Sequence, residues 1–200
     1  MPKFSPGGRR ASSAVVSTAT SASKPTASLE AAAAALKAHI RDVPDFPRNG
    51  ILFRDITPLL HEQFAATLDA LEGLFSEREW SEIDALAGVE SRGFVLAAGL
   101  AARRGKGFVP VRKQGKLPPP VVSAAYALEY GSGVLEMQRG AGDVFLIDDV
   151  LATGGTMHAS AELCVTAGYR VQAIAVLIDL RIVGDFTWDG MALRSLIRYD

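Results

Sequence analysis

The segment from residue 144 to residue 156, V-F-L-I-D-D-V-L-A-T-G-G-T, constrains the fold of this 200-residue chain more than any other. Its first four residues are apolar and predict a short buried strand. Two adjacent carboxylates, Asp148 and Asp149, come directly after that strand. A loop of small residues follows, and then a helical pattern begins. Strand, acidic pair, small loop and helix in this order are typical of an α/β protein with a phosphate site.

The loop itself consists of Ala152, Thr153, Gly154, Gly155 and Thr156. Its glycines allow the backbone to approach a phosphate closely, the free N–H groups of the following helix point at it, and the threonines add hydroxyl donors. The two preceding carboxylates would repel a phosphate. We therefore expect them to bind something else, either the two hydroxyls of a ribose or a metal ion that accompanies the phosphates.

This segment resembles the signature with which type I phosphoribosyltransferases bind phosphoribosyl pyrophosphate (PRPP). The resemblance implies that Asp148 and Asp149 hydrogen-bond the ribose hydroxyls and that residues 152–156 surround the 5′-phosphate. It also implies Mg²⁺ as cofactor, held mainly by PRPP, with Asp148 or Asp149 contributing through water. An ordinary strand-to-helix connection is the alternative, and the order and setting of all thirteen residues disfavour it.

Composition indicates a globular chain. It is 48% hydrophobic and 22% charged, and 200 residues suit one domain. The formal net charge of −1 gives no reason to expect nucleic acid or a membrane surface as partner. No apolar run approaches the roughly 20 residues that a membrane span needs. The single cysteine, Cys164, cannot form an internal disulfide, which fits a reducing compartment.

The chain divides near residue 28. Residues 1–28 are rich in Ser, Ala, Thr, Pro and Gly and carry basic but no acidic side chains. They contain too few large apolar residues to order themselves. Such a leader fits a disordered tail of a cytoplasmic protein and, equally, a transit peptide for a plastid or mitochondrion. Residues 29–200 form the predicted domain.

Within the domain, helical and strand patterns alternate. The predicted helices cover residues 29–41, 57–78, 91–104 and 156–167. The predicted strands cover residues 83–89, 108–111, 121–129, 134–138, 144–147, 171–179 and 195–199, with Gly131-Ser132-Gly133 turning a hairpin. This alternation predicts an α/β fold with a mainly parallel twisted sheet flanked by helices on both faces, and ligands at the carboxyl ends of its strands.

A second strand-to-helix junction, Glu90-Ser91-Arg92-Gly93-Phe94, predicts another anion site, with the arginine as a two-pronged donor and the glycine allowing close approach. A simple helix cap with a surface arginine is the alternative. Adenine phosphoribosyltransferases are similar here in Ser-Arg-Gly-Phe. That resemblance implies that Ser91 and Arg92 contact pyrophosphate.

Arg112, Lys113 and Lys116 end the next strand and precede a proline-rich run. A basic loop is usually a solvated surface, but cations beside a pyrophosphate site would stabilise a leaving group that carries several negative charges. The family resemblance implies that this loop contacts pyrophosphate and reaches across the interface of a homodimer.

The stretch Y-A-L-E-Y-G at residues 126–131 resembles part of a flexible hairpin lid, about residues 112–138, which would close and exclude water. In adenine phosphoribosyltransferases its glutamate is the proposed proton shuttle to the base. The resemblance therefore implies catalytic roles for Glu129 and Tyr130, together with Arg92. The alternative is a hairpin end with an exposed carboxylate.

Residues 42–60, punctuated by proline and glycine, are similar to the hood that covers the base in the same family. The resemblance implies that Phe53 stacks on adenine and that backbone groups of Leu52 and Arg54 read its edge. A backbone N–H and C=O match adenine and would leave unpaired groups against a 6-oxopurine.

Four motifs in family order thus resemble an adenine phosphoribosyltransferase, with a core at about residues 61–200 below the hood and lid. The resemblance implies purine salvage: adenine and PRPP give AMP and pyrophosphate. It implies no nucleic acid and no membrane as partners. Two alternatives stay open, a transferase for another nucleobase and a regulator that binds PRPP without catalysis.

Overall fold

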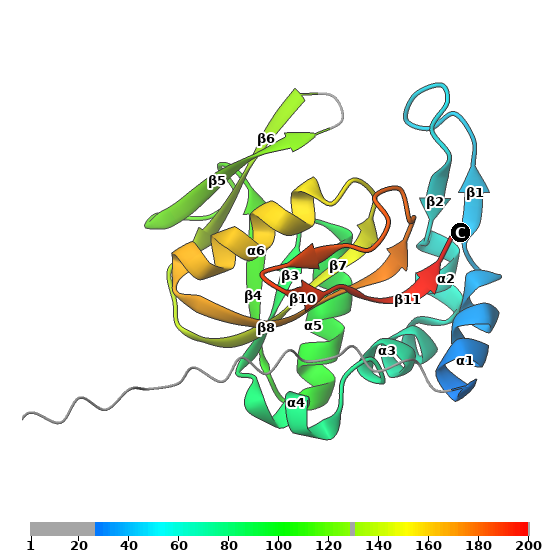
Figure 1. The fold of residues 1–200 in the computed structure, drawn as a ribbon, viewed down its shortest axis with the longest axis horizontal. Coiled ribbons are helices and arrows are strands. Elements are labelled where there is room, and N and C mark those ends of the chain that lie inside the picture. The colour runs from blue at the N-terminus through cyan, green and yellow to red at the C-terminus, as the bar shows by residue number, and fades with distance from the viewer. Residues whose placement is uncertain (1–26, 129–130, 200) are drawn as a thin grey trace, which may run out of the picture.

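The computed structural model describes residues 27–128 and 131–199 (Figure 1). The described helices are α1 (Ala27–Lys37), α2 (Thr57–Glu62), α3 (Phe64–Glu72), α4 (Glu77–Glu82), α5 (Arg92–Arg104) and α6 (Gly155–Ala167). The described strands are β1 (Arg41–Val43), β2 (Phe53–Asp55), β3 (Ala85–Val89), β4 (Gly107–Lys113), β5 (Val121–Leu128), β6 (Gly131–Gln138), β7 (Gly142–Leu151), β8 (Tyr169–Asp179), β9 (Thr187–Trp188), β10 (Met191–Ala192) and β11 (Arg194–Arg198). No described helix is long and apolar enough to cross a membrane.

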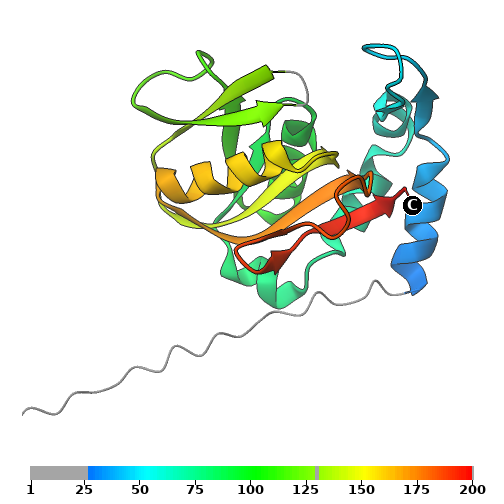
Figure 2. The same ribbon diagram turned by 45° about the horizontal axis from the view of Figure 1, so that its top comes forward.

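Among the described strands, seven form one sheet in the order β11-β8-β7-β3-β4-β6-β5. The first five run parallel, and β6 and β5 complete the sheet as an antiparallel hairpin. Figures 1 and 2 both show α6 across one face and α5 behind the sheet on the other. The predicted α/β fold, a mainly parallel sheet with helices on both faces, is confirmed.

The central strands are buried on both faces. In β7, Phe145 and Ile147 join the core beneath α5, whereas Val144 and Leu146 join the core beneath α6. Successive side chains of a strand point to opposite faces, so a strand covered twice must be apolar at every position. This is the physical reason for the continuous apolar run that precedes the acidic pair.

The sheet reverses its direction of growth between β3 and β7. These strands are parallel neighbours, with Gly88 opposite Ile147. From β3 the chain passes through α5 to β4 on one side, and from β7 it passes through α6 to β8 on the other. The two connections therefore leave a crevice at the carboxyl ends of β3 and β7, where α/β proteins bind ligands.

Some local expectations were wrong. The helix expected over 57–78 is three helices. The first break is at Gln63, between α2 and α3, and the second separates α3, with its C-cap Gly73, from α4, with its N-cap Ser76. Residues 131–133 belong to β6 instead of forming a turn, and the connection at 129–130 lies outside the described residues. The helix α1 already begins at Ala27, and the rest of the predicted leader, residues 1–26, also lies outside the described residues.

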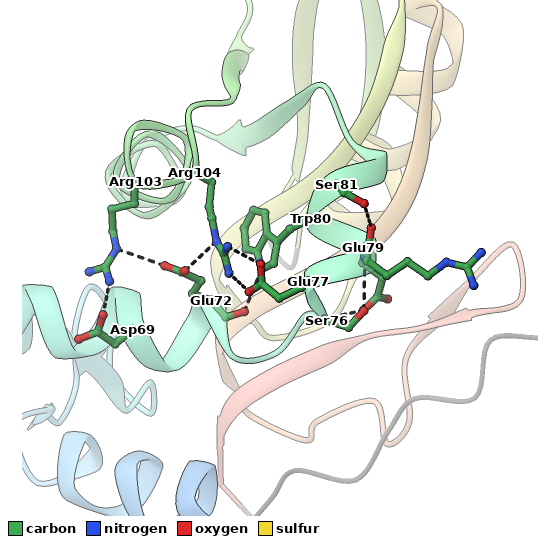
Figure 3. Close-up of polar contacts among 10 residues, drawn as sticks. Asp69, Glu72, Ser76, Glu77, Glu79, Trp80, Ser81, Arg103 and Arg104 are labelled. Carbon is green, nitrogen blue, oxygen red and sulfur yellow. Dashed lines mark hydrogen bonds and ion pairs between the residues drawn. The ribbon is translucent and has the colours of Figure 1, made fainter.

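A network of ion pairs anchors the far end of α5 (Figure 3). Arg104 places its Nη2 atom 2.6 Å from Glu77 Oε1 and its Nε atom 2.7 Å from Glu72 Oε1. Arg103 pairs with Asp69, and Trp80 donates a hydrogen bond to the carbonyl of Glu72. These contacts tie α5 to α3 and α4, so the opposite, N-terminal end of α5 is held in place at the crevice.

Glu79 closes a capping box at the start of α4 and also pairs with Arg194 of β11. Burial raises the pKa of its carboxyl, but the hydrogen bonds from Arg194 and Ser76 outweigh that effect and hold the pKa at about 2. The charged carboxylate thus stabilises the contact between β11 and the turn before α4.

We predict that Glu79→Gln lowers the free energy of unfolding by about 2 kcal/mol at neutral pH. Because the folded-state pKa is depressed, this contribution is complete above the ordinary value of 4.5 and is lost as the pH falls toward about 2. Urea unfolding of both proteins at a series of pH values measures the difference. If the difference in the free energy of unfolding between wild type and variant stays constant as the pH falls, the prediction is wrong.

Candidate active site

The two acidic side chains lie at the crevice, inside the second half of β7. Asp148 is 7% and Asp149 6% exposed. Asp148 Oδ1 accepts a hydrogen bond from the Asp149 N–H at 2.8 Å, and Asp149 Oδ2 lies 2.6 Å from Arg92 Nη2. Burial, and then repulsion by Asp149, raises the pKa of Asp148 well above its ordinary value. Burial also raises the pKa of Asp149, against the opposing charge of Arg92.

A cavity of about 270 Å³ opens at this pair. Its lining joins the acidic residues to the phosphate loop predicted from sequence: Asp148, Asp149, Ala152, Thr153, Gly154 and Thr156. Gly155 is the first residue of α6. The structure therefore brings together the residues predicted to bind ribose and phosphate, and the buried carboxylates remain accessible from the cavity.

The phosphate loop depends on glycine at residue 154. Gly154 is the N-cap of α6 with a φ of +81°, a conformation that other residues rarely adopt. A Cβ there would also lie 2.7 Å from the ring of Phe186. The ring of Phe186 therefore packs against the loop at Gly154. No local sequence pattern indicated this contact.

The second predicted anion site faces the first. Ser91 is the N-cap of α5 and Arg92 is its first residue. A Cβ at Gly93 would lie 2.8 Å from Asp148 Oδ1 and 3.0 Å from the carbonyl oxygen of Ile147. Only glycine allows the start of α5 to pack this closely on the end of β7, and the packing directs Arg92 to the acidic pair.

Of the three predicted cations, Lys113 lines the cavity. Arg112 Nε donates to Glu90 Oε2 at 3.2 Å, and the Lys113 N–H donates to the same oxygen at 2.9 Å. Burial raises the pKa of Glu90, but these donors hold it below its ordinary value. Lys116 is exposed on the following turn. Glu90 thus joins the two predicted pyrophosphate segments, a role that the sequence interpretation missed.

A second cavity, of about 380 Å³, lies under the ribbon formed by β1 and β2. Phe53, Phe46 and Arg92 contribute to its lining, so Arg92 borders this cavity as well as pairing with Asp149. Arg92 Cζ is 5.0 Å from the centre of the Phe53 ring, and Phe46 packs edge-on against Phe53 at 5.1 Å. The structure thus places the predicted base-stacking residue beside Arg92, which in turn pairs with Asp149.

The side chains flanking Phe53 point elsewhere. Leu52 is 46% exposed, and Arg54 pairs with Asp42. Arg54 also lies over the ring of Tyr199 at 3.8 Å, with Lys37 Nζ 4.0 Å from the same ring. These contacts attach the ribbon to the end of the chain, where β11 ends beside β2 (Figure 1). Leu52 and Arg54 are not among the residues that line the second cavity, so their backbone contacts to a base stay a prediction.

The hairpin of β5 and β6 borders the other side of the crevice. Tyr126 lines the first cavity, and burial, followed by the charges of Asp148 and Glu90, raises the pKa of its hydroxyl. The predicted catalytic residues Glu129 and Tyr130 lie outside the described residues. Within the described ranges, no three His, Cys, Asp or Glu side chains gather as a metal site.

Comparison with known proteins agrees with this architecture. The "Phosphoribosyl transferase domain" family matches residues 61–190, so the fold and the crevice are those of a phosphoribosyltransferase. The adenine phosphoribosyltransferase of Hydrogenovibrio crunogenus is 53% identical over 166 residues, which cover 82% of this chain and 96% of the relative. The chain belongs to the adenine phosphoribosyltransferase family.

Two crystal structures of such enzymes are similar to this chain. The enzyme of Rhodothermus marinus is 40% identical with a TM-score of 0.76, over 84% of this chain and 99% of that one. The enzyme of Saccharomyces cerevisiae is 35% identical with a TM-score of 0.76, over 83% and 98%, and was crystallised with an imino-altritol bisphosphate and adenine. The resemblance inferred from the motifs is therefore confirmed.

We predict that Asp148→Asn stabilises the protein while it weakens PRPP binding. The amide keeps an acceptor for the Asp149 N–H and removes one of two adjacent buried charges, so the free energy of unfolding should rise by about 1 kcal/mol at neutral pH. The affinity for PRPP should fall at least about tenfold. Because the pKa of Asp148 is raised, wild type loses stability as the pH rises from 3.8 through the folded-state value; the variant, which keeps only the raised pKa of Asp149, should lose less.

Chemical unfolding and calorimetric PRPP titration measure both effects. Asp143→Asn is the matched control on the same strand. The Asp143 carboxylate pairs with Arg170, and that hydrogen bond lowers its pKa. Its loss should reduce stability and leave PRPP affinity unchanged. A destabilised Asp148→Asn protein with wild-type PRPP affinity would contradict the assignment.

Proposed function

We propose that this chain transfers the 5-phosphoribosyl group from PRPP to adenine, giving AMP and pyrophosphate in purine salvage. The observation that carries the proposal is a pair of cavities on either side of one ion pair, because Asp149 lines the first cavity and its partner Arg92 lines the second. One is lined by carboxylates and a glycine loop, as a ribose 5-phosphate requires, and the other is lined by Phe53 and Phe46, as a flat base requires. The reacting sugar carbon would lie near the Arg92–Asp149 ion pair.

The sugar is held at both ends. Asp148 and Asp149 accept hydrogen bonds from its 2′- and 3′-hydroxyls, which would stabilise two adjacent carboxylates whose pKa values burial raises in the free protein. Backbone N–H groups and the hydroxyls of Thr153 and Thr156 donate to the 5′-phosphate at the start of α6. Fixing the sugar in this way orients its C1 atom for attack by the base.

The leaving group carries most of the charge that develops. As the bond from C1 to the pyrophosphate oxygen breaks, negative charge grows on pyrophosphate and positive charge on the sugar. Ser91 and Arg92 approach from the start of α5, and Arg112, Lys113 and Lys116 approach from the end of β4 and its loop. Cations positioned before the reaction stabilise this charge without reorganisation.

Adenine binds beneath the hood and forms the new bond to C1. Phe53 stacks on the ring, and backbone groups of Leu52 and Arg54 pair with its edge. Glu129 takes up the proton that the attacking nitrogen loses, with Tyr130 beside it. A 6-oxopurine would leave these backbone groups unpaired, and unpaired buried polar groups discriminate strongly.

Mg²⁺ fits this site as a substrate-borne ion. Asp148 and Asp149 offer the oxygen donors that Mg²⁺ prefers, but two carboxylates are too few for a protein cage, so they would hold it through water and PRPP. When bound, the ion would neutralise pyrophosphate oxygens. Chelation should therefore abolish turnover and leave the unfolding temperature of the free protein unchanged.

A homodimer would cover an apolar patch next to the cationic loop. Val95 and Phe108 are 44% and 38% exposed, although both are apolar. Phe94 packs against Phe108 at 5.5 Å, and Arg112 lies 5.8 Å above the Phe94 ring. A second copy on this patch would bring its own cationic loop near the site.

We place the protein in the cytoplasm. The alternative is a plastid or mitochondrion, with residues 1–28 as a transit peptide. Sequencing the N-terminus of the mature protein distinguishes the two, because removal of residues 1–28 would indicate import.

A turnover assay with labelled PRPP, Mg²⁺ and a series of bases tests the proposal. AMP should form with adenine, and hypoxanthine should react at least roughly 10²-fold less efficiently in kcat/KM. Equal use of both purines, or faster use of another base, would assign a different substrate. PRPP binding without any product would make the chain a regulator.

We predict that Glu129→Ala lowers kcat by roughly 10²–10⁴-fold, the usual contribution of a positioned acid or base. PRPP affinity should stay within about twofold, because the residue acts on the base. Steady-state kinetics and PRPP titration separate the two effects, and Glu82→Ala on the surface of α4 is the control. A pure loss of PRPP affinity would reassign Glu129.

A further inference from the structure

Glu136 is a buried carboxylate that has no part in the roles described so far. It lies on β6, opposite Arg112 of β4, and only 3% of the residue is exposed. A buried carboxylate is unfavourable unless it is fully hydrogen-bonded. The buried position of Glu136 therefore requires hydrogen-bond donors, and the identity of these donors indicates the role of the residue.

Three consecutive backbone N–H groups supply those donors. The N–H of Gly115 donates to Glu136 Oε2 at 3.0 Å, and those of Lys116 and Leu117 donate to Oε1 at 2.6 Å each. The hydrogen bonds from Gly115, and then those from Leu117 and Lys116, lower the pKa of Glu136. Gly115 has a φ of +79°, which lets the chain turn around the carboxylate. A single side chain thus fixes the turn that follows the cationic strand end.

The other end of the same loop is held by a second carboxylate. Glu90 accepts from the Lys113 N–H and from Arg112, and Arg112 Nη1 also donates to the carbonyl of Lys116 at 3.1 Å. The guanidinium of Arg112 thus links Glu90 to the backbone of this loop. Lys113, whose N–H is bound by Glu90 and which precedes the residues bound by Glu136, also lines the cavity.

Fixing this loop has a direct electrostatic consequence. Lysine is a point charge on a flexible stem, so its effect on an anion depends on where the backbone starts the stem. Charges stabilise a developing anion best when their positions are set before it forms. A loop released from Glu136 would keep its cations but lose their fixed positions.

We infer that Glu136 is a positioning residue for pyrophosphate: by binding three backbone N–H groups of residues 115–117, it sets the loop that presents Lys113 and Lys116 to the leaving group. The inference rests on the proposed phosphoribosyl transfer. The inference assigns a role to a residue that would contact neither substrate directly. Its substitution should weaken the binding of pyrophosphate and PRPP and leave the binding of adenine unchanged.

Glu136→Gln tests this directly. The amide keeps the size of the side chain but presents an NH₂ group where Glu136 has an acceptor, so one of the three loop N–H groups loses its partner. KM for pyrophosphate in the reverse reaction with AMP, and KM for PRPP in the forward reaction, should rise about tenfold. KM for adenine should change less than about twofold, because residues 115–117 are not among the described residues that line the cavity beneath β1 and β2.

Glu79→Gln is the matched control. It removes another hydrogen-bonded, partly buried carboxylate, far from the loop. It should reduce stability without raising KM for pyrophosphate and PRPP relative to KM for adenine. Equal changes in all KM values for Glu136→Gln, as a general loss of stability would produce, would overturn the inference, and so would an unchanged KM for pyrophosphate. Failure of wild type to form AMP would refute the proposed function instead. If Glu136→Gln is unstable, pyrophosphate titration of Glu136→Asp, whose shorter side chain cannot reach the turn, should show the same weakening.

Discussion

Two carboxylates buried side by side create the main electrostatic conflict in this molecule. Asp148 and Asp149 are both nearly inaccessible to bulk solvent, and burial raises the pKa of each. Arg92 compensates for part of this cost through its contact with Asp149. A free-energy cost retained at a cavity often marks a functional site, and the two hydroxyl donors of a ribose are the groups that we propose to relieve it.

The surrounding fold makes this arrangement possible. Growth of the sheet in opposite directions from β3 and β7 brings the start of α5 and the phosphate loop to one crevice. Gly93 lets α5 approach the acidic pair, and the ion pairs of Arg103 and Arg104 hold the far end of that helix. Arg92 borders the cavity beneath β1 and β2 while it pairs with Asp149, so one side chain links the proposed base site to the acidic pair.

The sequence predicted the sheet, the acidic pair and the phosphate loop because each follows from local order along the chain. Residues 144–156 combine the apolar run of a buried strand, two adjacent carboxylates and a glycine turn in one short segment. Contacts across the fold left no such signal. Glu136 and its turn are 19 to 21 residues apart, and Tyr199 reaches Arg54 from the opposite end of the domain. Phe186 beneath Gly154 was equally invisible, because a phenylalanine in a loop fits many environments.

A crystal structure of the chain with AMP and Mg²⁺ tests the central claim most directly. The account predicts ribose hydroxyls within hydrogen-bond distance of Asp148 and Asp149, the phosphate against residues 152–156, and the adenine ring beside Phe53. A nucleotide bound elsewhere, or one whose ribose hydroxyls face solvent while the acidic pair stays unliganded, would contradict it.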